Sequence, residues 1–186
     1  QIPYFGYRHL THLSDPRAIA LGESLVTEMI ARGDRVINRD ESVAYLGLNY
    51  YELERVEGEL GAREKYDSIG RQAFSPVRLM RKLLAEISPD LVVTTNSPRT
   101  EEAVVVASGQ LGLKSLVLAG PFLKDELTRF SSNRYGSIIC AMYDWQKREL
   151  INKGRLDNTV VVTGNPAFCP PSDEELAKNT KALRLK

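Results

Sequence analysis

The sequence predicts an α/β domain with a doubly wound, mostly parallel sheet of about seven strands and helices on both faces, on the strength of three observations. Four short runs are apolar almost throughout rather than alternating, which is typical of strands buried on both faces of a parallel sheet. Stretches of helical character separate the runs, in the order of βαβ units. Each run ends in a polar, glycine or proline turn. The runs are residues 91–95, 115–119, 137–141 and 159–163, with helices expected at 98–111 and 144–153.

The first half of the chain gives weaker signals. We expect a first strand at residues 2–7 and then a helix from Asp15-Pro16, because aspartate is a good N-cap and proline suits a first turn. Gly33 is expected to end this helix. The remaining expectations are a strand at 35–38, a short helix at 41–48, a strand at 50–56 and a loop at 57–69.

A further helix is expected at residues 70–87, where apolar residues recur on one face at helical spacing. Four basic residues lie on or beside its polar face, namely Arg71, Arg78, Arg81 and Lys82. Such a face is usually solvated surface, but it can also contact anionic lipid. We therefore keep a peripheral membrane contact through the helix at 70–87 as an alternative.

The composition is that of an ordinary globular chain. Its 186 residues suit one domain, and 25 Lys plus Arg against 24 Asp plus Glu leave a net charge of +1. This balance gives no electrostatic footprint for nucleic acid. No apolar run approaches the roughly 20 residues of a membrane span. Cys140 and Cys169 are too few for a disulfide framework or a zinc site, so a reducing cytoplasm is expected.

Ligands of doubly wound sheets bind beyond the carboxyl ends of the strands, at the switch point in strand order. The turns after the expected strands are therefore the candidate site. They are residues 8–14, 96–101, 120–122, 142–145 and 164–168.

The turn after the strand at 91–95 carries the sharpest local pattern. Asn96 or Ser97 can cap the following helix, and Glu101 in its first turn favours the positive helix end. A helix amino terminus also binds anions, and Arg99 would add a charge-assisted donor. Plain capping and ligand contact both explain these residues.

His9 and His12 are the two histidines of the chain, and both fall in the turn after the expected first strand. A histidine there can act as a general base near neutral pH. We favour His12, which is nearer the helix start, and the alternative is a pair of solvated loop histidines. The spacing of the two is poor evidence for a metal site.

Several common enzyme classes lack their signatures. There is no Gly-x-Gly-x-x-Gly, no Walker loop and no Gly-x-Ser-x-Gly elbow. These absences weigh against a dehydrogenase, a P-loop enzyme and an α/β-hydrolase. Neither cysteine has a convincing partner for thiol chemistry.

Three segments carry a resemblance to a known superfamily. Residues 89–103 read Pro-Asp-Leu-Val-Val-Thr-Thr-Asn-Ser-Pro-Arg-Thr-Glu-Glu-Ala, residues 161–168 read Val-Val-Thr-Gly-Asn-Pro-Ala-Phe, and the first helix ends in Gly33-Asp34-Arg35-Val36. Together they resemble the N-terminal, acceptor-side Rossmann-like domain of GT-B-fold glycosyltransferases and of the related nucleotide-sugar 2-epimerases. The chain departs from that pattern in lacking the histidine of the Gly-His-x-Val turn. It also lacks the aspartate of the epimerase His-Gly-Asp motif.

The resemblance implies an architecture and a reaction. Residues 1–171 would form the Rossmann-like domain, and residues 172–186 a C-terminal helix leading towards a second Rossmann-like domain that holds the nucleotide-sugar donor. The partner would be a sugar or glycolipid acceptor in cell-envelope or glycan biosynthesis, with no bound cofactor or metal. His12 would be the base. The substrate-binding residues would be His9, Asn96, Ser97, Arg99, Glu101, Gly120, Gly164 and Asn165.

The sequence leaves two other functions open. The chain can instead belong to a nucleotide-sugar 2-epimerase relative, or to a non-catalytic subunit that recruits a catalytic partner to a membrane. A start at Gln1 and an end in Lys-Ala-Leu-Arg-Leu-Lys suggest a piece of a longer protein, with a trimmed complete domain as the alternative. In isolation the chain is expected to be inactive.

Overall fold

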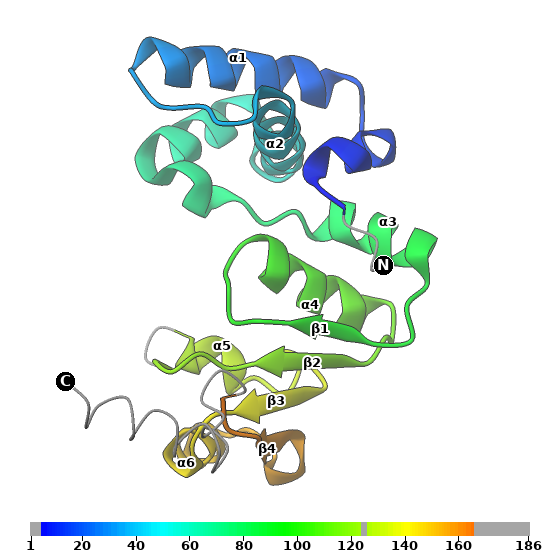
Figure 1. Ribbon diagram of the computed structural model, residues 1–186, viewed down its shortest axis with the longest axis vertical. Helices are drawn as coiled ribbons and strands as arrows, with labels where there is room; N and C mark the ends of the chain where they lie inside the picture. Colours follow the sequence, from blue (N-terminus) through cyan, green and yellow to red (C-terminus); the bar gives the residue numbers. More distant parts are fainter. Residues whose placement is uncertain (1–4, 124–125, 166–186) are drawn as a thin grey trace, which may run out of the picture.

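The computed structural model describes residues 5–123 and 126–165, and Figure 1 shows a helical half above a parallel sheet. The helical half consists of η1 (Tyr7–Leu13), α1 (Arg17–Ala31), α2 (Arg39–Ile69), η2 (Gly70–Ala73) and α3 (Val77–Ile87). The second half consists of β1 (Val92–Thr94), α4 (Thr100–Gln110), β2 (Ser115–Leu118), α5 (Leu127–Phe130), β3 (Ile138–Ala141), α6 (Asp144–Asn152), η3 (Asp157–Thr159) and β4 (Val160–Val162). No helix of the described part is long and apolar enough to cross a membrane.

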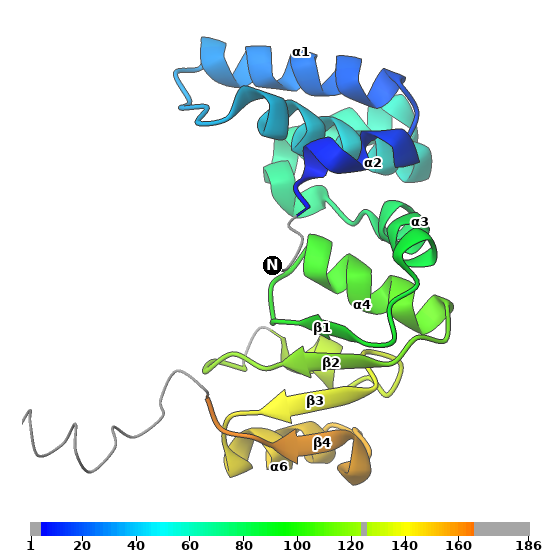
Figure 2. The same ribbon diagram turned by 45° about the vertical axis from the view of Figure 1, so that its right-hand side comes forward.

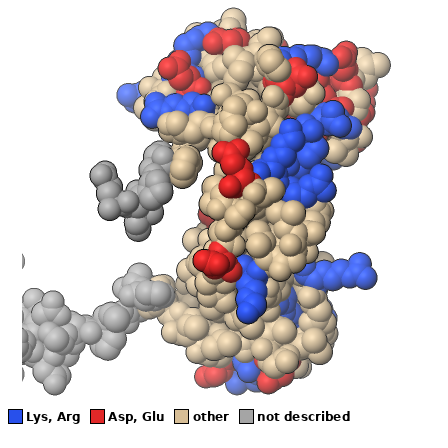
Figure 3. Space-filling view, turned by 90° about the vertical axis from the view of Figure 1, so that its right-hand side faces the viewer, with Lys and Arg blue, Asp and Glu red and all other residues tan. Residues whose placement is uncertain are grey.

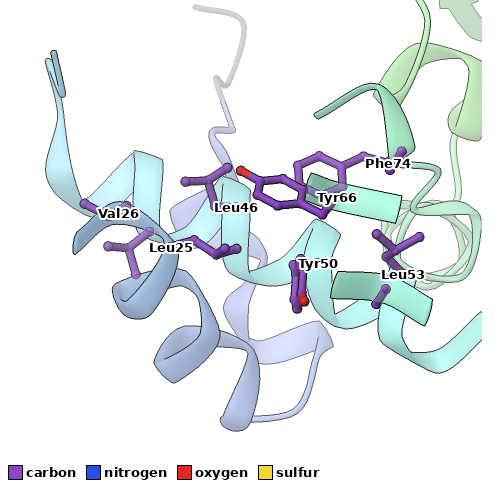
Figure 4. Close-up of a cluster of buried hydrophobic side chains, with 10 residues drawn as sticks. Leu25, Val26, Leu46, Tyr50, Leu53, Tyr66 and Phe74 are labelled. Atoms are coloured by element: carbon purple, nitrogen blue, oxygen red, sulfur yellow. The ribbon is translucent and has the colours of Figure 1, made fainter. Parts of the chain in front are cut away.

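The helices α1 and α2 cross at a pair of glycines. A Cβ on Gly22 would collide with the carbonyl oxygen of Val43, and a Cβ on Gly47 would collide with that of Ala18. The absence of both side chains therefore lets the two backbones touch. Beside this contact, apolar and aromatic side chains of α1 and α2 form a core that Phe74 extends (Figure 4).

Aromatic rings organise one end of that core. The Tyr66 ring stacks on Phe74 at 5.5 Å between centroids, and Tyr50 meets Tyr66 edge-on at 5.5 Å. Offset-stacked and edge-to-face pairs are the favoured geometries of aromatic rings. Gly58, at φ 74° and ψ 169°, interrupts α2 and turns its second part so that Tyr66 can reach this cluster.

The sheet has four parallel strands in the order β1-β2-β3-β4. Because each strand pairs with the next one along the chain and βαβ crossovers are right-handed, the helices α4, α5 and α6 all lie on one face. That face is well packed. Val117 and Ile139 pair in register, and both are fully buried with Val105 of α4, Phe130 of α5 and Leu150 of α6.

The opposite face carries apolar side chains without a covering layer among the described residues. Val93, Leu118 and Val161 are exposed there, at 56%, 38% and 47%. The strand register aligns two rows across this face, Val93–Leu116–Ile138 and Leu118–Cys140–Val161. None of these six residues belongs to a core cluster of the described chain. We call these six residues the open face, in which Cys140 alone is buried, at 9%.

The α/β class and the parallel sheet are confirmed, whereas about seven strands and helices on both faces are wrong for the described residues, which contain four strands covered on one face. The four apolar runs and the helices between them are confirmed. The expected strand at 50–56 and loop at 57–69 lie instead inside α2. Residues 35–38 lead into α2, which Asn38 caps by accepting from the Glu41 N–H at 3.1 Å. The expected helix at 172–186 lies outside the described residues.

Candidate ligand site at the carboxyl edge of the sheet

All four strands point the same way, so the turns that follow them meet at one edge (Figure 2). Residues 95–99 follow β1, residues 119–123 follow β2 and residues 142–143 follow β3. Three of the five turns expected to form the site are therefore brought together, and the described part of a fourth joins them. Gly164 and Asn165 follow β4 at the same edge, after Thr163 adds a further backbone hydrogen bond to Ala141, at 2.9 Å.

Asn96 ties the turn after β1 to the turn after β2 and to α5. Its side-chain amide donates to Glu126 at 3.0 Å, and its carbonyl oxygen accepts from Arg129 at 3.1 Å. Gly120 packs directly against it, because a Cβ on Gly120 would lie 2.5 Å from the Asn96 side-chain nitrogen. Asn96 and Gly120, both expected in the site, are thus neighbours in the structure.

Gln146 links the turn after β2 to the turn after β3, as Asn96 links the turns after β1 and β2. It is fully buried in α6, donates to the Gly120 carbonyl oxygen at 2.8 Å and accepts from the Met142 N–H at 2.8 Å. One side chain therefore fixes the turns after β2 and β3 relative to each other. Since buried polar groups are costly unless they are hydrogen-bonded, this link holds the edge firmly.

The amino terminus of α4 differs from the capping hypothesis. Its N-cap is Arg99, without a side-chain cap, so neither Asn96 nor Ser97 caps the helix; Ser97 is half-buried in the turn. Glu101 instead reaches back and accepts from the backbone N–H and the hydroxyl of Thr95, both at 2.6 Å. Acidic side chains thus occupy the positive helix end that a ligand anion would need.

Arg99 has a strained backbone. Its φ of 67° is combined with ψ of −105°, a region that residues with a side chain rarely adopt. Such conformations cost on the order of 1–3 kcal/mol and persist where the surroundings enforce them. Arg99 also lines a pocket of about 520 Å³ between the α4 start and the segment Gln72–Ser75.

An aromatic pocket opens beside the polar links. Phe122 after β2 is 82% exposed, while Tyr143 and Trp145 after β3 are 40% and 44% exposed. The Tyr143 and Trp145 rings stack, with centroids 6.3 Å apart and planes 13° from parallel. With Leu127 and Glu149 they line a pocket of about 750 Å³, which is in the size range of small-molecule sites.

Sequence reasoning marked the turns of these three aromatic residues but not their side chains. The usable signal was the position of Tyr143 and Trp145, two residues apart directly after an apolar strand. Because β3 has ended before these positions, their large rings do not pack in the core of the sheet, and a binding role is the remaining interpretation.

His9 and His12 do not follow a strand of the described residues, which corrects their expected placement after a first strand. They belong to η1, where the Gly6 N–H donates to His9 Nδ1 at 2.9 Å. His12 Nε2 lies 3.0 Å from a Glu86 carboxylate oxygen, and both side chains are more than half exposed. Glu86 is in the last turn of α3, which leads into the amino end of β1. This end is opposite the candidate site.

In residues 5–123 and 126–165, no group of three or more His, Cys, Asp or Glu side chains lies in a metal-binding arrangement. Cys140 lies buried in β3, and burial raises the pKa of its thiol, which disfavours the reactive thiolate.

Comparison with known proteins adds no identification: no family model, no curated protein and no solved structure matches the chain.

Proposed function

We propose that this chain is the acceptor-binding, Rossmann-like half of a GT-B-type glycosyltransferase that uses a nucleotide-sugar donor. The observation that carries the proposal is the convergence of three βα turns at one edge, tied by Asn96, Gly120 and Gln146 and bordered by an aromatic pocket. A rigid polar edge beside an open apolar pocket suits a ligand that is both hydroxylated and partly apolar.

The proposal gives a role to only some of the expected residues. Asn96, Glu101 and Gly120 shape the edge, and Gly164 and Asn165 flank it after β4. His12 is left out of the acceptor site, because it pairs with Glu86 beyond the other end of β1. The proposal therefore assigns the catalytic base to no residue of the described edge.

The test is ligand binding by this chain, measured by saturation-transfer NMR with methyl glycosides, disaccharides and nucleotide sugars. Glycosides are expected to bind, and nucleotide sugars to bind no better than the same sugars without a nucleotide. Binding of nucleotide sugars alone, or of no sugar at all, would overturn the assignment of the acceptor half.

A pair of glycine variants locates the binding. Gly120→Ala should abolish it, because the new Cβ displaces Asn96 from its hydrogen bond to Glu126. Gly109→Ala on α4 is the matched control, since its Cβ meets only one atom at an ordinary 3.9 Å. Equal loss in both variants would move the site away from the edge. Conversion of a nucleotide sugar without acceptor, by a longer form of the protein, would favour the 2-epimerase alternative.

The membrane-recruiting alternative is favoured by one surface. Lys and Arg side chains gather where α3 lies (Figure 3). Arg78 is committed to Glu52 at 2.7 Å, and Lys82 donates to the Leu13 carbonyl oxygen, which leaves Arg81 the more available charge. Sedimentation with anionic vesicles tests this function, and Arg81→Glu should reduce it if lipid binds there.

A further inference from the structure

We infer that the aromatic pocket of Phe122, Tyr143 and Trp145 binds the ring of an uncharged pyranoside, stacked on an aromatic face, with Glu149 accepting hydrogen bonds from its hydroxyls. This inference deepens the proposed function and rests on it, since it names the chemical class of the acceptor. Four observations carry it, from exposure, scaffold, charge and size.

The three aromatic side chains of the pocket are unusually exposed. Large aromatic side chains bury most of their surface in folded proteins, yet three of them stand exposed around one pocket, at 82%, 44% and 40%. Contiguous exposed apolar surface of this kind marks a binding site more often than chance. The rings come from two different turns, so the pocket is not a by-product of one local sequence.

The scaffold holds the rings in place. Tyr143 is the extended N-cap residue of α6, and its carbonyl oxygen accepts from the Gln146 N–H at 3.1 Å. Gln146, the residue after Trp145, is fully buried and is anchored to Gly120 and Met142. A platform fixed at a strand–helix junction loses little conformational freedom on binding a ligand, which favours affinity.

The charged side chains of the described lining favour an uncharged, hydroxylated ligand over an anion. No lysine or arginine of the described residues lines the pocket, so these residues offer a phosphate or a pyrophosphate no charge-assisted donor. Glu149 supplies a carboxylate, which accepts hydrogen bonds from hydroxyls and repels anions. A pyranose ring has both required parts, because its axial C–H bonds form an apolar face and its hydroxyls project around the rim.

Size agrees with a glycoside. A pocket of about 750 Å³ leaves room for a sugar ring together with part of its aglycone or a second ring. The open mouth of the site, at the edge of the sheet, suits an acceptor that continues into solvent or towards another domain. A lipid chain and a nucleobase also stack on or pack against aromatic rings, and the experiment separates these ligands.

The experiment uses Trp145, the one tryptophan of the chain, as a reporter built into the site. Its emission is followed during titration with methyl glucosides, galactosides, mannosides and N-acetylglucosaminides, and again with acrylamide as a quencher. At least one glycoside should shift the emission saturably and protect Trp145 from acrylamide. Glycerol at equal concentration should do neither, because it has no ring to stack.

Variants tie the signal to the pocket. Phe122→Ala should weaken glycoside binding by about tenfold, as loss of a stacked aromatic wall does, and Glu149→Gln by a smaller factor. Phe5→Ala removes a phenylalanine that is 57% exposed outside the pocket and should leave binding unchanged. Unfolding midpoints near that of the unaltered chain show that the pocket variants remain folded.

Three outcomes overturn the inference: no glycoside changes the Trp145 emission, uridine monophosphate binds as well as the best glycoside, or an alkyl detergent monomer competes more strongly than any sugar. Its failure is distinct from failure of the proposed function. Glycosides that bind in the NMR test without perturbing Trp145 leave the acceptor half standing and place its ligand elsewhere on the edge. If glycosides perturb Trp145 but nucleotide sugars bind much better than the same sugars without a nucleotide, the assignment as the acceptor half fails. The sugar site at Trp145 then still stands.

Discussion

The two faces of the sheet are made of the same kinds of residue but have opposite surroundings. Val117, Ile139 and Val160 face α4, α5 and α6 and are fully buried, whereas Val93, Leu118 and Val161 alternate with them and are exposed. Apolar character alone therefore does not decide which face a helix covers. The consecutive strand order decides it, because three right-handed crossovers in the same direction place every helix on one side.

The largest loss of stability should come from removing the hydrogen bonds that Arg155 makes beneath the covered face of the sheet. Arg155 is 2% exposed, and its guanidinium donates to four carbonyl oxygens, that of Phe130 at the end of α5 and those of Ser132, Tyr135 and Gly136 between α5 and β3. Burial lowers its pKa, but arginine stays charged throughout the usual pH range. Arg155→Met leaves these acceptors without a donor and should cost about 4 kcal/mol or more in urea unfolding.

Arg155→Lys is the conservative variant. It keeps the charge but replaces a planar fork by a point donor, so it should recover only part of the loss. A cost below about 1 kcal/mol for Arg155→Met would show that water reaches these carbonyl oxygens and replaces the guanidinium.

Two adjacent isoleucines give the direct comparison of the faces. Ile139 is fully buried among the residues packed under the helices, while Ile138 is half-buried on the open face. Ile139→Ala should cost about 3 kcal/mol, through lost burial and a cavity, and Ile138→Ala less than about 1 kcal/mol. Urea unfolding of both variants measures the difference. Equal costs would mean that the open face is covered in solution.

Sequence reasoning succeeded on the sheet and failed on the first half for a physical reason. Continuous apolar runs such as Leu91–Thr95 are typical of parallel strands, although Val93 of this run is exposed on the open face. The segment Tyr50–Val56 alternates well enough to resemble a strand, yet in α2 Tyr50 and Leu53 share the core face while Val56 is 79% exposed. Packing against α1 through Gly22 and Gly47 selects the helix, and no local pattern reports that contact.

The candidate site was predictable to the same extent. The sequence places Asn96 and Gly120 in turns at the same edge of the sheet, because strand ends locate turns, and the structure brings them into contact. The pairing of His12 with Glu86, 74 residues away, depends on tertiary structure and could not be read from spacing. Exposure separates the aromatic residues of the pocket from core residues, and exposure follows only from the fold.

Tyr135 is a residue of the covered face whose buried hydroxyl is unpaired among the described residues, so it tests how dry that face is. It is 6% exposed, and its hydroxyl has no hydrogen-bond partner in the described structure. Burial raises its pKa to about 12, against a smaller opposing effect of Arg129. Tyr135→Phe removes the unpaired hydroxyl and should stabilise the fold by about 1 kcal/mol near neutral pH.

The pH dependence of the same variant follows from that raised pKa. The unfolded tyrosine loses its proton near its ordinary pKa of about 10, while the folded one keeps it until about pH 12. Stability contributed by the protonated phenol is therefore complete below pH 10 and is lost as the pH rises towards 12. Urea midpoints at pH 9 to 12 should fall less steeply for Tyr135→Phe, and parallel curves would show a hydrated hydroxyl.

The smallest effect is expected on the open face itself. Val161 and Val160 are neighbours on β4, exposed at 47% and 1%. Threonine has nearly the shape of valine and adds a hydroxyl, which an exposed site tolerates and a buried one does not. Val161→Thr should change the free energy of unfolding by less than about 0.5 kcal/mol, and Val160→Thr should cost about 1–2 kcal/mol. A cost at Val161 as large as at Val160 would mean that an additional layer protects the open face, and the strand order would then no longer describe all that this sheet packs against.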